Sequence, residues 1–259
     1  MFTDNPFAGL AAWVSSGAMQ AFVIVMIAFV VLGTLHDMRH KKSSTYFFDN
    51  WRVAKRRGTR PVGGGDMAAL ALKTAAVDVL TSGEFCNLRR RIAHLLGMYG
   101  FILYAIATVV MVFGYPHAPT PVVLPVLWHL GALMVCVGGY WFWFFLRVDV
   151  AAEGHSRLRV VRADLFVLAL LANATLALLW SWQQQANNGW STAFLYLYVI
   201  SAVVLFGSVP WSKFSHMFYK PAAAFQKRVE NACGSRSNLP AAADRPELFG
   251  SVRRTARHY

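Results

Sequence analysis

Two histidines in this sequence, His94 and His216, have the residue type and setting to bind a redox cofactor. His94 begins a long apolar segment in RRRIAHLLGMYGF, and His216 follows another in VPWSKFSHMFYKP. Imidazole is a common axial ligand of haem iron, and a haem with two histidine ligands needs both at equal depth on facing helices. The alternative is that both are interfacial histidines bound to headgroups or backbone. The residues by themselves leave these two interpretations open.

His129 and Asn173 are the main polar side chains expected inside apolar segments. Each could serve a ligand, or could simply hydrogen-bond a neighbouring helix. No Asp or Glu is expected in the middle of these segments, because Asp164 falls at the end of one. Ion-coupled transporters usually need such a carboxylate, so its absence counts against that class of protein.

The three cysteines do not form a metal-binding pattern. Cys86, Cys136 and Cys233 include no CxxC pair. The sequence therefore predicts no iron–sulfur cluster and no zinc site in this chain. Any such centre would have to belong to another subunit.

Five apolar segments are long enough to hold these side chains inside a bilayer. Hydrophobic residues make up 56% of the 259 residues and charged residues only 14%, against about 25% charged in soluble domains. A span needs roughly 20 mostly apolar residues. The sequence predicts an all-α bundle of five transmembrane helices, with spans near residues 10–35, 92–114, 122–146, 164–182 and 192–209, none of which contains Lys or Arg.

The basic residues predict the orientation of this bundle. Twelve of the 25 Lys and Arg residues fall at 39–91, four between the third and fourth spans, and nine beyond the fifth. Loops rich in Lys and Arg stay in the cytoplasm. We therefore expect a protein of the bacterial inner membrane with its N-terminus outside and its C-terminus in the cytoplasm. Topology and anionic lipid account for the net charge of +13, which argues against nucleic-acid binding.

The same pattern divides the chain into five regions. Residues 1–9 form an outer N-terminus, 10–35 the first span, and 36–91 a basic cytoplasmic loop. Within this loop, residues 67–80 have the apolar spacing of a helix that lies on the membrane or on a partner. Residues 92–220 hold the other four spans and the PWSKFSH segment, and 221–259 form a basic cytoplasmic tail that is expected to be disordered from about residue 232.

The segment VPWSKFSHMFYKP resembles the end of the last helix in the respiratory nitrate reductase gamma subunit family. This family includes membrane subunits of quinone-interacting oxidoreductases and of heterodisulfide reductases, and the membrane anchor of adenylylsulfate reductase. The resemblance covers most of residues 10–230 and is firmest at 89–115 and 192–220. It implies the five-helix plan, with the N-terminus outside, and the adenylylsulfate reductase anchor is the most similar member.

The resemblance also implies positions for haem ligands. In this family two b haems are typically held by an H-x9-H pattern on the second helix and an H-x17-H pattern that ends in the Pro-Ser-Lys segment. His94 and His216 match the first and last of these ligands, whereas Tyr104 and Tyr198 stand at the two middle positions. Ten residues of helix span about 15 Å, so both tyrosines belong to the outer haem. The resemblance therefore implies at most one b haem, near the cytoplasm.

The expected function is that of a membrane subunit in a respiratory or sulfur-metabolism oxidoreductase complex. Such a subunit anchors a cytoplasmic iron–sulfur or flavin reductase on its basic loop and tail and links this enzyme to membrane quinone. The subunit itself is either non-catalytic or an electron-transfer subunit of the complex. Tyr104, His129 and Tyr198 are candidates to line a quinone site in the vacated outer region, against the alternative of ordinary aromatic packing. Two other functions stay open: a haem-free structural anchor, and a small permease or assembly factor.

Overall fold

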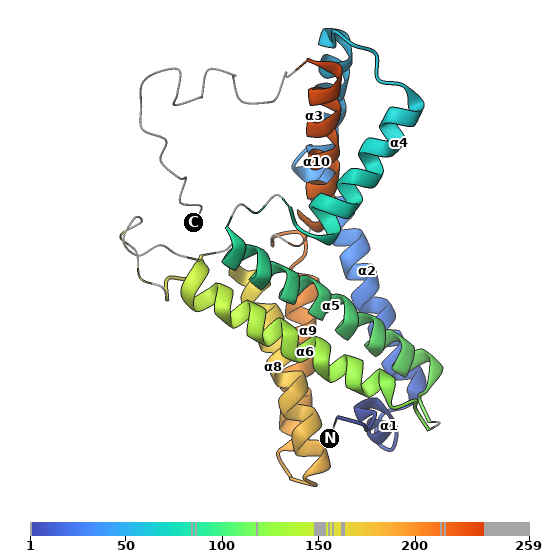
Figure 1. The fold of residues 1–259 in the computed structure, drawn as a ribbon. Helices are drawn as coiled ribbons and strands as arrows, with labels where there is room; N and C mark the ends of the chain where they lie inside the picture. The colour runs from blue at the N-terminus through green and yellow to red at the C-terminus, as the bar shows by residue number, and fades with distance from the viewer. Residues whose placement is uncertain are drawn as a thin grey trace. The chain divides into compact units, whose positions relative to one another are not determined.

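The computed structural model describes residues 2–83, 85, 87–117, 119–147, 154, 156, 158–161, 164–212, 214 and 216–235, except for the side chains of Ser43 and His216. Every regular element among them is a helix (Figure 1), which confirms the all-α prediction. The chain divides into two compact units, each described by itself. The first contains Met1–Asp37 and Arg89–Phe214, and the second contains Met38–Leu88 and Ser215–Tyr259.

Four helices of the first unit are long and apolar enough to cross a membrane, which indicates a membrane protein. The fifth apolar helix, α9, has 17 residues and falls short of that length. Four of the five predicted spans are thus present as span-length helices, while the fifth span and the orientation of the termini stay predictions. The five helices are α2 (Ser16–His40), α5 (Leu88–Gly114), α6 (Val123–Trp141) continuing as the π-helix η2 (Phe142–Leu146), α8 (Leu165–Gln185) and α9 (Ser191–Gly207).

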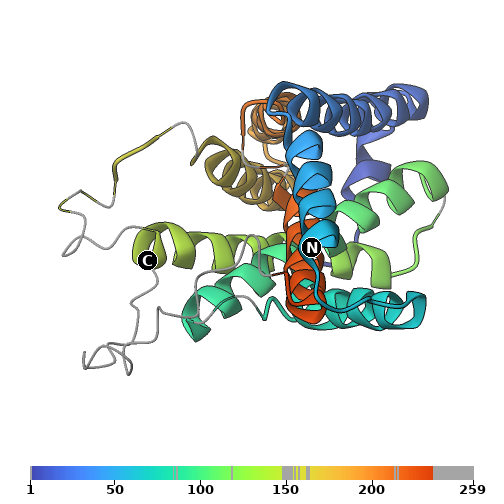
Figure 2. The same ribbon diagram turned by 90° about the horizontal axis from the view of Figure 1, so that it is seen from above.

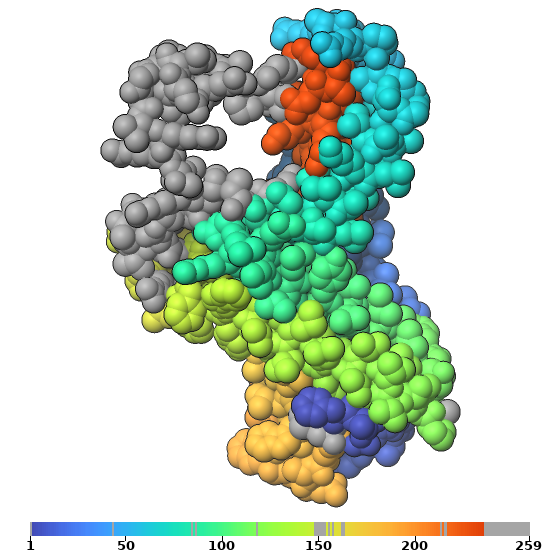
Figure 3. Space-filling model, viewed as in Figure 1, coloured from blue at the N-terminus to red at the C-terminus, as the bar shows by residue number. Residues whose placement is uncertain are grey.

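The N-terminal segment forms a short helix of its own, α1 (Pro6–Leu10), and the first long helix begins only at Ser16. The Asn5 side chain caps α1 by accepting a hydrogen bond from the Phe7 amide at 3.0 Å. Asn5 Nδ2 also donates to Thr120 Oγ1 at 2.9 Å. Figure 3 shows this dark blue segment against the surfaces of α6 and α8. The segment predicted to be a plain outer terminus is therefore packed into the first unit.

Glycines bring α5 and α6 into close contact, and the two helices lie side by side in Figures 1 and 2. A Cβ atom added to Gly131 would lie 2.7 Å from the Gly100 carbonyl oxygen, and one added to Gly138 would lie 2.7 Å from the Ala93 carbonyl oxygen. Such small residues allow helix backbones to approach closely inside a membrane. Gly97 is different, because a Cβ there would meet no heavy atom within 4 Å in the part of the chain that the structure describes.

The second unit is also helical, with α3 (Ser43–Arg57), α4 (Gly64–Lys73), the π-helix η1 (Thr74–Leu80) and α10 (His216–Cys233). The helix predicted over 67–80 is present as parts of α4 and η1, and both pack against α10. Arg228 of α10 donates two hydrogen bonds to the Asp78 carboxylate of η1, at 2.7 and 2.9 Å. The predicted disordered tail falls mostly on 236–259, outside the described residues.

Candidate functional site

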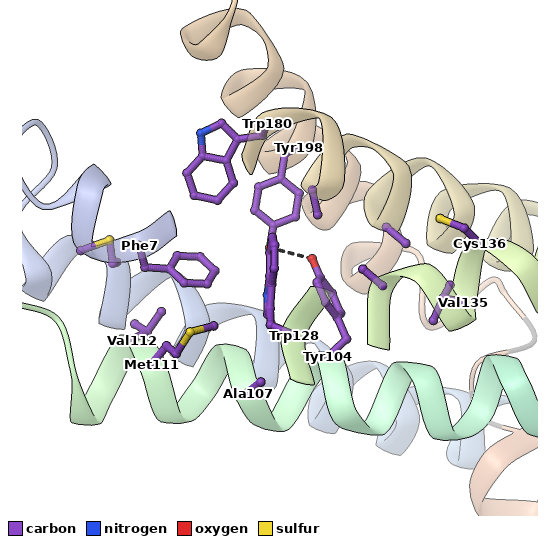
Figure 4. Packing of buried hydrophobic residues seen from close by; sticks show 14 residues of the cluster. Phe7, Tyr104, Ala107, Met111, Val112, Trp128, Val135, Cys136, Trp180 and Tyr198 are labelled. Carbon is purple, nitrogen blue, oxygen red and sulfur yellow. Dashed lines mark hydrogen bonds between the residues drawn. The ribbon is translucent and has the colours of Figure 1, made fainter. Parts of the chain in front are cut away.

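Two tyrosines from different helices meet in the core of the first unit. The hydroxyl oxygens of Tyr104 on α5 and Tyr198 on α9 lie 2.8 Å apart, and both side chains are buried (Figure 4). These are the two positions at which the family pattern would place the ligands of the outer haem. The structure thus brings together the pair that the resemblance assigned to one site.

Asn173 of α8 extends this pair into a closed hydrogen-bonded network. The Tyr104 hydroxyl lies 3.1 Å from Asn173 Oδ1, which can only accept. A phenol carries a single proton, so when both bonds are made Tyr104 donates to Asn173 and accepts from Tyr198. Asn173 Nδ2 donates in turn to Ser201 Oγ at 3.1 Å and to the Tyr198 carbonyl at 3.4 Å. Of the two interpretations of Asn173, the structure shows the hydrogen bonds to neighbouring helices, since the network joins α5, α8 and α9.

Large aromatic side chains fill the space around the tyrosine pair. Trp180 stacks on Tyr198 with ring centroids 5.5 Å apart and an interplanar angle of 12°. The ring centroids of Trp128 and Tyr104 lie 5.4 Å apart. Phe7 of α1 packs against both tryptophans, at 5.8 and 5.6 Å (Figure 4). The outer region that the resemblance assigns to a haem is therefore occupied by protein side chains.

His129 lies next to Trp128 and is fully buried, with both ring nitrogens engaged by the protein. Nδ1 lies 2.7 Å from the Pro125 carbonyl oxygen and Nε2 lies 2.8 Å from Ser181 Oγ. A carbonyl can only accept, so Nδ1 carries the proton and Nε2 accepts from the serine hydroxyl. His129 thereby joins α6 to α8, and it contributes a second polar contact beside the tyrosine network.

Two of the three quinone candidates, Tyr104 and His129, contact Trp128, and the third, Tyr198, contacts Tyr104, but the polar atoms of all three are already paired within the protein. The hydroxyls of Tyr104 and Tyr198 bond each other, and the ring nitrogens of His129 bond Pro125 and Ser181. A quinone carbonyl could reach these groups only if existing hydrogen bonds broke. Their assignment to a quinone site stays a prediction.

The two haem-ligand candidates belong to different units. His94 lies in the first turns of α5 and is half-buried, and Gly97, one turn later, has open space at its Cβ position among the described residues. His216 is the first residue of α10, and its side chain lies outside the description. Of the two glycines that follow His94 on α5, Gly100 packs closely against Gly131 and Met134 of α6, whereas Gly97 leaves open space.

Sequence reasoning missed a buried carboxylate, Asp37, in the last turns of α2. The predicted first span ends at residue 35 and leaves Asp37 in the following loop, whereas α2 continues to His40 and Asp37 is only 1% exposed. Thr34, one turn earlier, is also buried. The signal that could have found them is spacing: Gly33, Thr34 and Asp37 recur at the i, i+1 and i+4 positions of one helix face.

Comparisons with known proteins give one distant similarity. Citrate utilization protein B of Escherichia coli is 26% identical over 206 residues, which cover 73% of this chain and 52% of that protein. The chain thus spans about half the length of this curated relative. No family model matches the sequence, and no solved structure matches it.

Proposed function

We propose that this chain is the membrane subunit of an oxidoreductase complex, linking a cytoplasmic flavin or iron–sulfur enzyme to the quinone pool. Its apolar core would then comprise five spans including α9, with the N-terminus outside. The observation that carries the proposal is the contact between Tyr104 and Tyr198, 2.8 Å apart. A resemblance that pairs positions 104 and 198 as ligands of one haem requires α5 and α9 to face each other there. The observed contact supports that register.

The outer of the two family haem sites does not fit a haem in this chain. Tyrosine hydroxyls bonded to each other replace the histidines, and Trp128, Trp180 and Phe7 fill the surrounding space. We therefore assign no electron transfer across the outer half of the bilayer to this chain.

The inner site fits better at the one ligand that the structure describes. His94 is half-buried, and the open position at Gly97 on the same helix face leaves room for a planar group. On the sequence pattern, His216 is the second ligand. A b haem held there would carry single electrons between a quinone and the soluble partner. The contribution of the chain is to supply the imidazoles and to keep the outer region closed.

The partner is proposed to be a cytoplasmic enzyme with an acidic docking surface. The second unit carries three consecutive exposed basic residues at the end of α3, Lys55, Arg56 and Arg57. Opposite charge on a partner would speed its association. The name of the distant relative refers to citrate utilisation. This supports an organic acid, rather than the sulfur compound suggested by the adenylylsulfate reductase anchor, as the substrate of the soluble partner.

A reduced-minus-oxidised absorbance spectrum of the purified full chain, with haem quantified per protein, tests this function. We expect about one b haem per chain, lost in His94→Ala and in His216→Ala. His117→Ala is the matched control, because His117 is exposed in the segment after α5. Its Nε2 lies 3.1 Å from Ser16 Oγ of α2, away from both proposed ligands in the sequence. Loss of haem in the control, or retention in both test variants, would contradict the ligand assignment.

The haem-free anchor is the second candidate, and the loss of both outer ligands is the observation that favours it. It predicts that no haem is present, yet a cytoplasmic oxidoreductase co-purifies with the chain. A permease or assembly factor predicts that neither haem nor a stable oxidoreductase partner is recovered. Co-purification from mildly solubilised membranes therefore separates the three functions.

A further inference from the structure

Four buried polar side chains lie on two segments that end on the same side of the first unit, and none of them takes part in the cluster around Tyr104. Two come from α2 and two from the segment that follows α9. Asp37 is the most notable, because a carboxylate within a membrane helix is costly and marks a functional candidate by default. The four are Thr34, Asp37, Ser208 and Ser212, which we call the inner polar patch.

A close contact between the two segments places these side chains near one another. A Cβ added to Gly33 of α2 would lie 2.9 Å from Val209 Cβ and 3.1 Å from Pro210 Cδ. In Figure 1, α2 and α9 run in the same direction. Asp37, about one turn after Gly33, therefore lies at the level of the residues just beyond Pro210, which include Ser212. The contact itself joins Gly33, the neighbour of Thr34, to Val209 and Pro210, the two residues that follow Ser208.

The patch contains an available hydrogen-bonding group. Thr34 Oγ1 is buried and has no hydrogen-bond partner among the residues that the structure describes. Leaving such a group unsatisfied costs about 1–3 kcal/mol. The outer cluster differs, since the hydroxyls of Tyr104 and Tyr198 and both ring nitrogens of His129 have protein partners. A ligand that accepts a hydrogen bond gains more at Thr34 than in the outer cluster.

The rim of the patch is apolar and exposed. Leu35, next to Thr34, is 56% exposed, and Trp211, next to Ser212, is 74% exposed. Tryptophan at a helix end is typical of the membrane interface, where its ring contacts both lipid and headgroup. A ligand that reaches the patch through this rim must be membrane-soluble and must carry polar acceptor atoms.

We propose that the inner polar patch binds the ring of a quinone, with Thr34 donating to one ring carbonyl and Asp37 exchanging the protons of the reaction. This inference rests on the proposed function and locates its substrate at the end of the bundle where α2 and α9 end, rather than beside Tyr104 and His129. A quinone has the required chemistry: an apolar tail, a flat ring for contact with Trp211, and two carbonyl oxygens that accept hydrogen bonds.

The reaction balances with groups that the proposal names. In quinone reduction, the ring receives two electrons from the flavin or iron–sulfur centre of the soluble partner, and two protons, one on each carbonyl oxygen. The Asp37 carboxyl passes protons to the ring and is reprotonated from the aqueous phase at its own end of the bundle. In quinol oxidation the carboxylate accepts the same protons, as a general base.

Photo-crosslinking of the full chain in lipid nanodiscs with an azido-ubiquinone maps the site directly. We expect the label on peptides containing residues 29–38 or 205–212. A label confined to peptides around 104, 129 and 198 would overturn the location while leaving the quinone function intact. Specific label is label that an excess of decylubiquinone removes. If no peptide carries such label, the result contradicts the quinone link of the proposed function instead.

Two substitutions test the assigned roles. Thr34→Val keeps the side-chain shape, and we expect it to weaken decylubiquinone binding roughly three- to tenfold, as loss of one hydrogen bond does. Thr192→Val is its matched control, because Thr192 is exposed on α9, and it should bind as the unmodified chain does. In the complex with its soluble partner, Asp37→Asn should lower kcat for quinone reduction tenfold or more, with KM within threefold. An unchanged kcat, or equal effects of the two threonine variants, would overturn the assignment.

Discussion

Replacing either tyrosine of the buried pair by phenylalanine removes a hydroxyl, but the two changes should differ in cost. Without the Tyr104 hydroxyl, Asn173 Oδ1 loses the group that donates to it, and the Tyr198 hydroxyl loses the oxygen that accepts its proton. Without Tyr198, Tyr104 can still donate to Asn173 at 3.1 Å. Tyr104→Phe thus leaves two buried polar groups with a lost partner, and Tyr198→Phe leaves only one unused acceptor site on Tyr104.

These losses translate into free energies of unfolding. We expect Tyr104→Phe to cost about 1–3 kcal/mol, the range for leaving buried polar groups unsatisfied. Tyr198→Phe should cost about 0.5–1.5 kcal/mol, the net value of one hydrogen bond, and the lower end applies inside a membrane. The double variant should cost less than the sum of the two, because Tyr198 is no longer stranded when both hydroxyls are gone, and contacting residues couple by about 0.5–3 kcal/mol.

Equilibrium unfolding of the full chain in mixed micelles, with increasing SDS and circular dichroism as the signal, measures these differences. Tyr196→Phe on α9 is the matched control, since that side chain is 64% exposed, and it should change the free energy of unfolding by less than about 0.5 kcal/mol. A larger loss for Tyr198→Phe than for Tyr104→Phe would refute the assigned direction of the bonds. Strict additivity in the double variant would refute the network itself.

Two further substitutions test how the helices are held. Gly131→Ala places a Cβ 2.6 Å from the Tyr104 amide nitrogen, so α5 and α6 must separate and the midpoint of SDS unfolding should fall clearly, whereas Gly114→Ala at the end of α5 enters open space among the described residues and should leave the midpoint unchanged. Arg147→Gln leaves the buried Asp164 carboxylate without its ion-pair partner, at an expected cost of about 3–5 kcal/mol; Arg52→Gln breaks an exposed pair and should cost less than about 1 kcal/mol. Equal effects within either matched pair would contradict the reasoning.

The long helices could be predicted because hydropathy over 20 residues is a strong signal, but their ends could not. The first span was ended at residue 35 on the approach of charged residues, while α2 runs to His40 and buries Asp37. A carboxylate beside a run of basic residues has the sequence appearance of a loop. The segment after α9 meets α2 one turn before Asp37 through Gly33 and Val209, which are 176 positions apart in the sequence, and no local pattern contains such a contact.

The candidate site was predicted in its pairing and missed in its packing. The family register placed Tyr104 and Tyr198 in one region, and the structure places their hydroxyls in contact. The packing of Phe7 against Trp128 and Trp180 had no signal in the sequence, because a single aromatic residue in a five-residue helix carries no periodicity. The pairing of His94 with His216 stays a prediction.

The aromatic packing around the tyrosine pair leads to a prediction about restoring the second haem. If only the ligands had been lost, Tyr104→His with Tyr198→His would recover an outer haem, because those positions face each other. The structure indicates a second obstacle, since Trp128, Trp180 and Phe7 occupy the volume that a macrocycle would need.

Burial of each of these rings stabilises the protein by roughly 1.5–3 kcal/mol. A haem at this site would have to displace the rings and also α1, which carries Phe7, so we expect the rings to stay in place. We therefore expect the double histidine variant to contain the same amount of haem per chain as the unmodified protein. A second b haem in its spectrum would show that ligand identity alone closed the outer site, and that the aromatic cluster yields readily. An unchanged haem content in a folded variant would show that the packing, and not just the ligands, now excludes the outer haem.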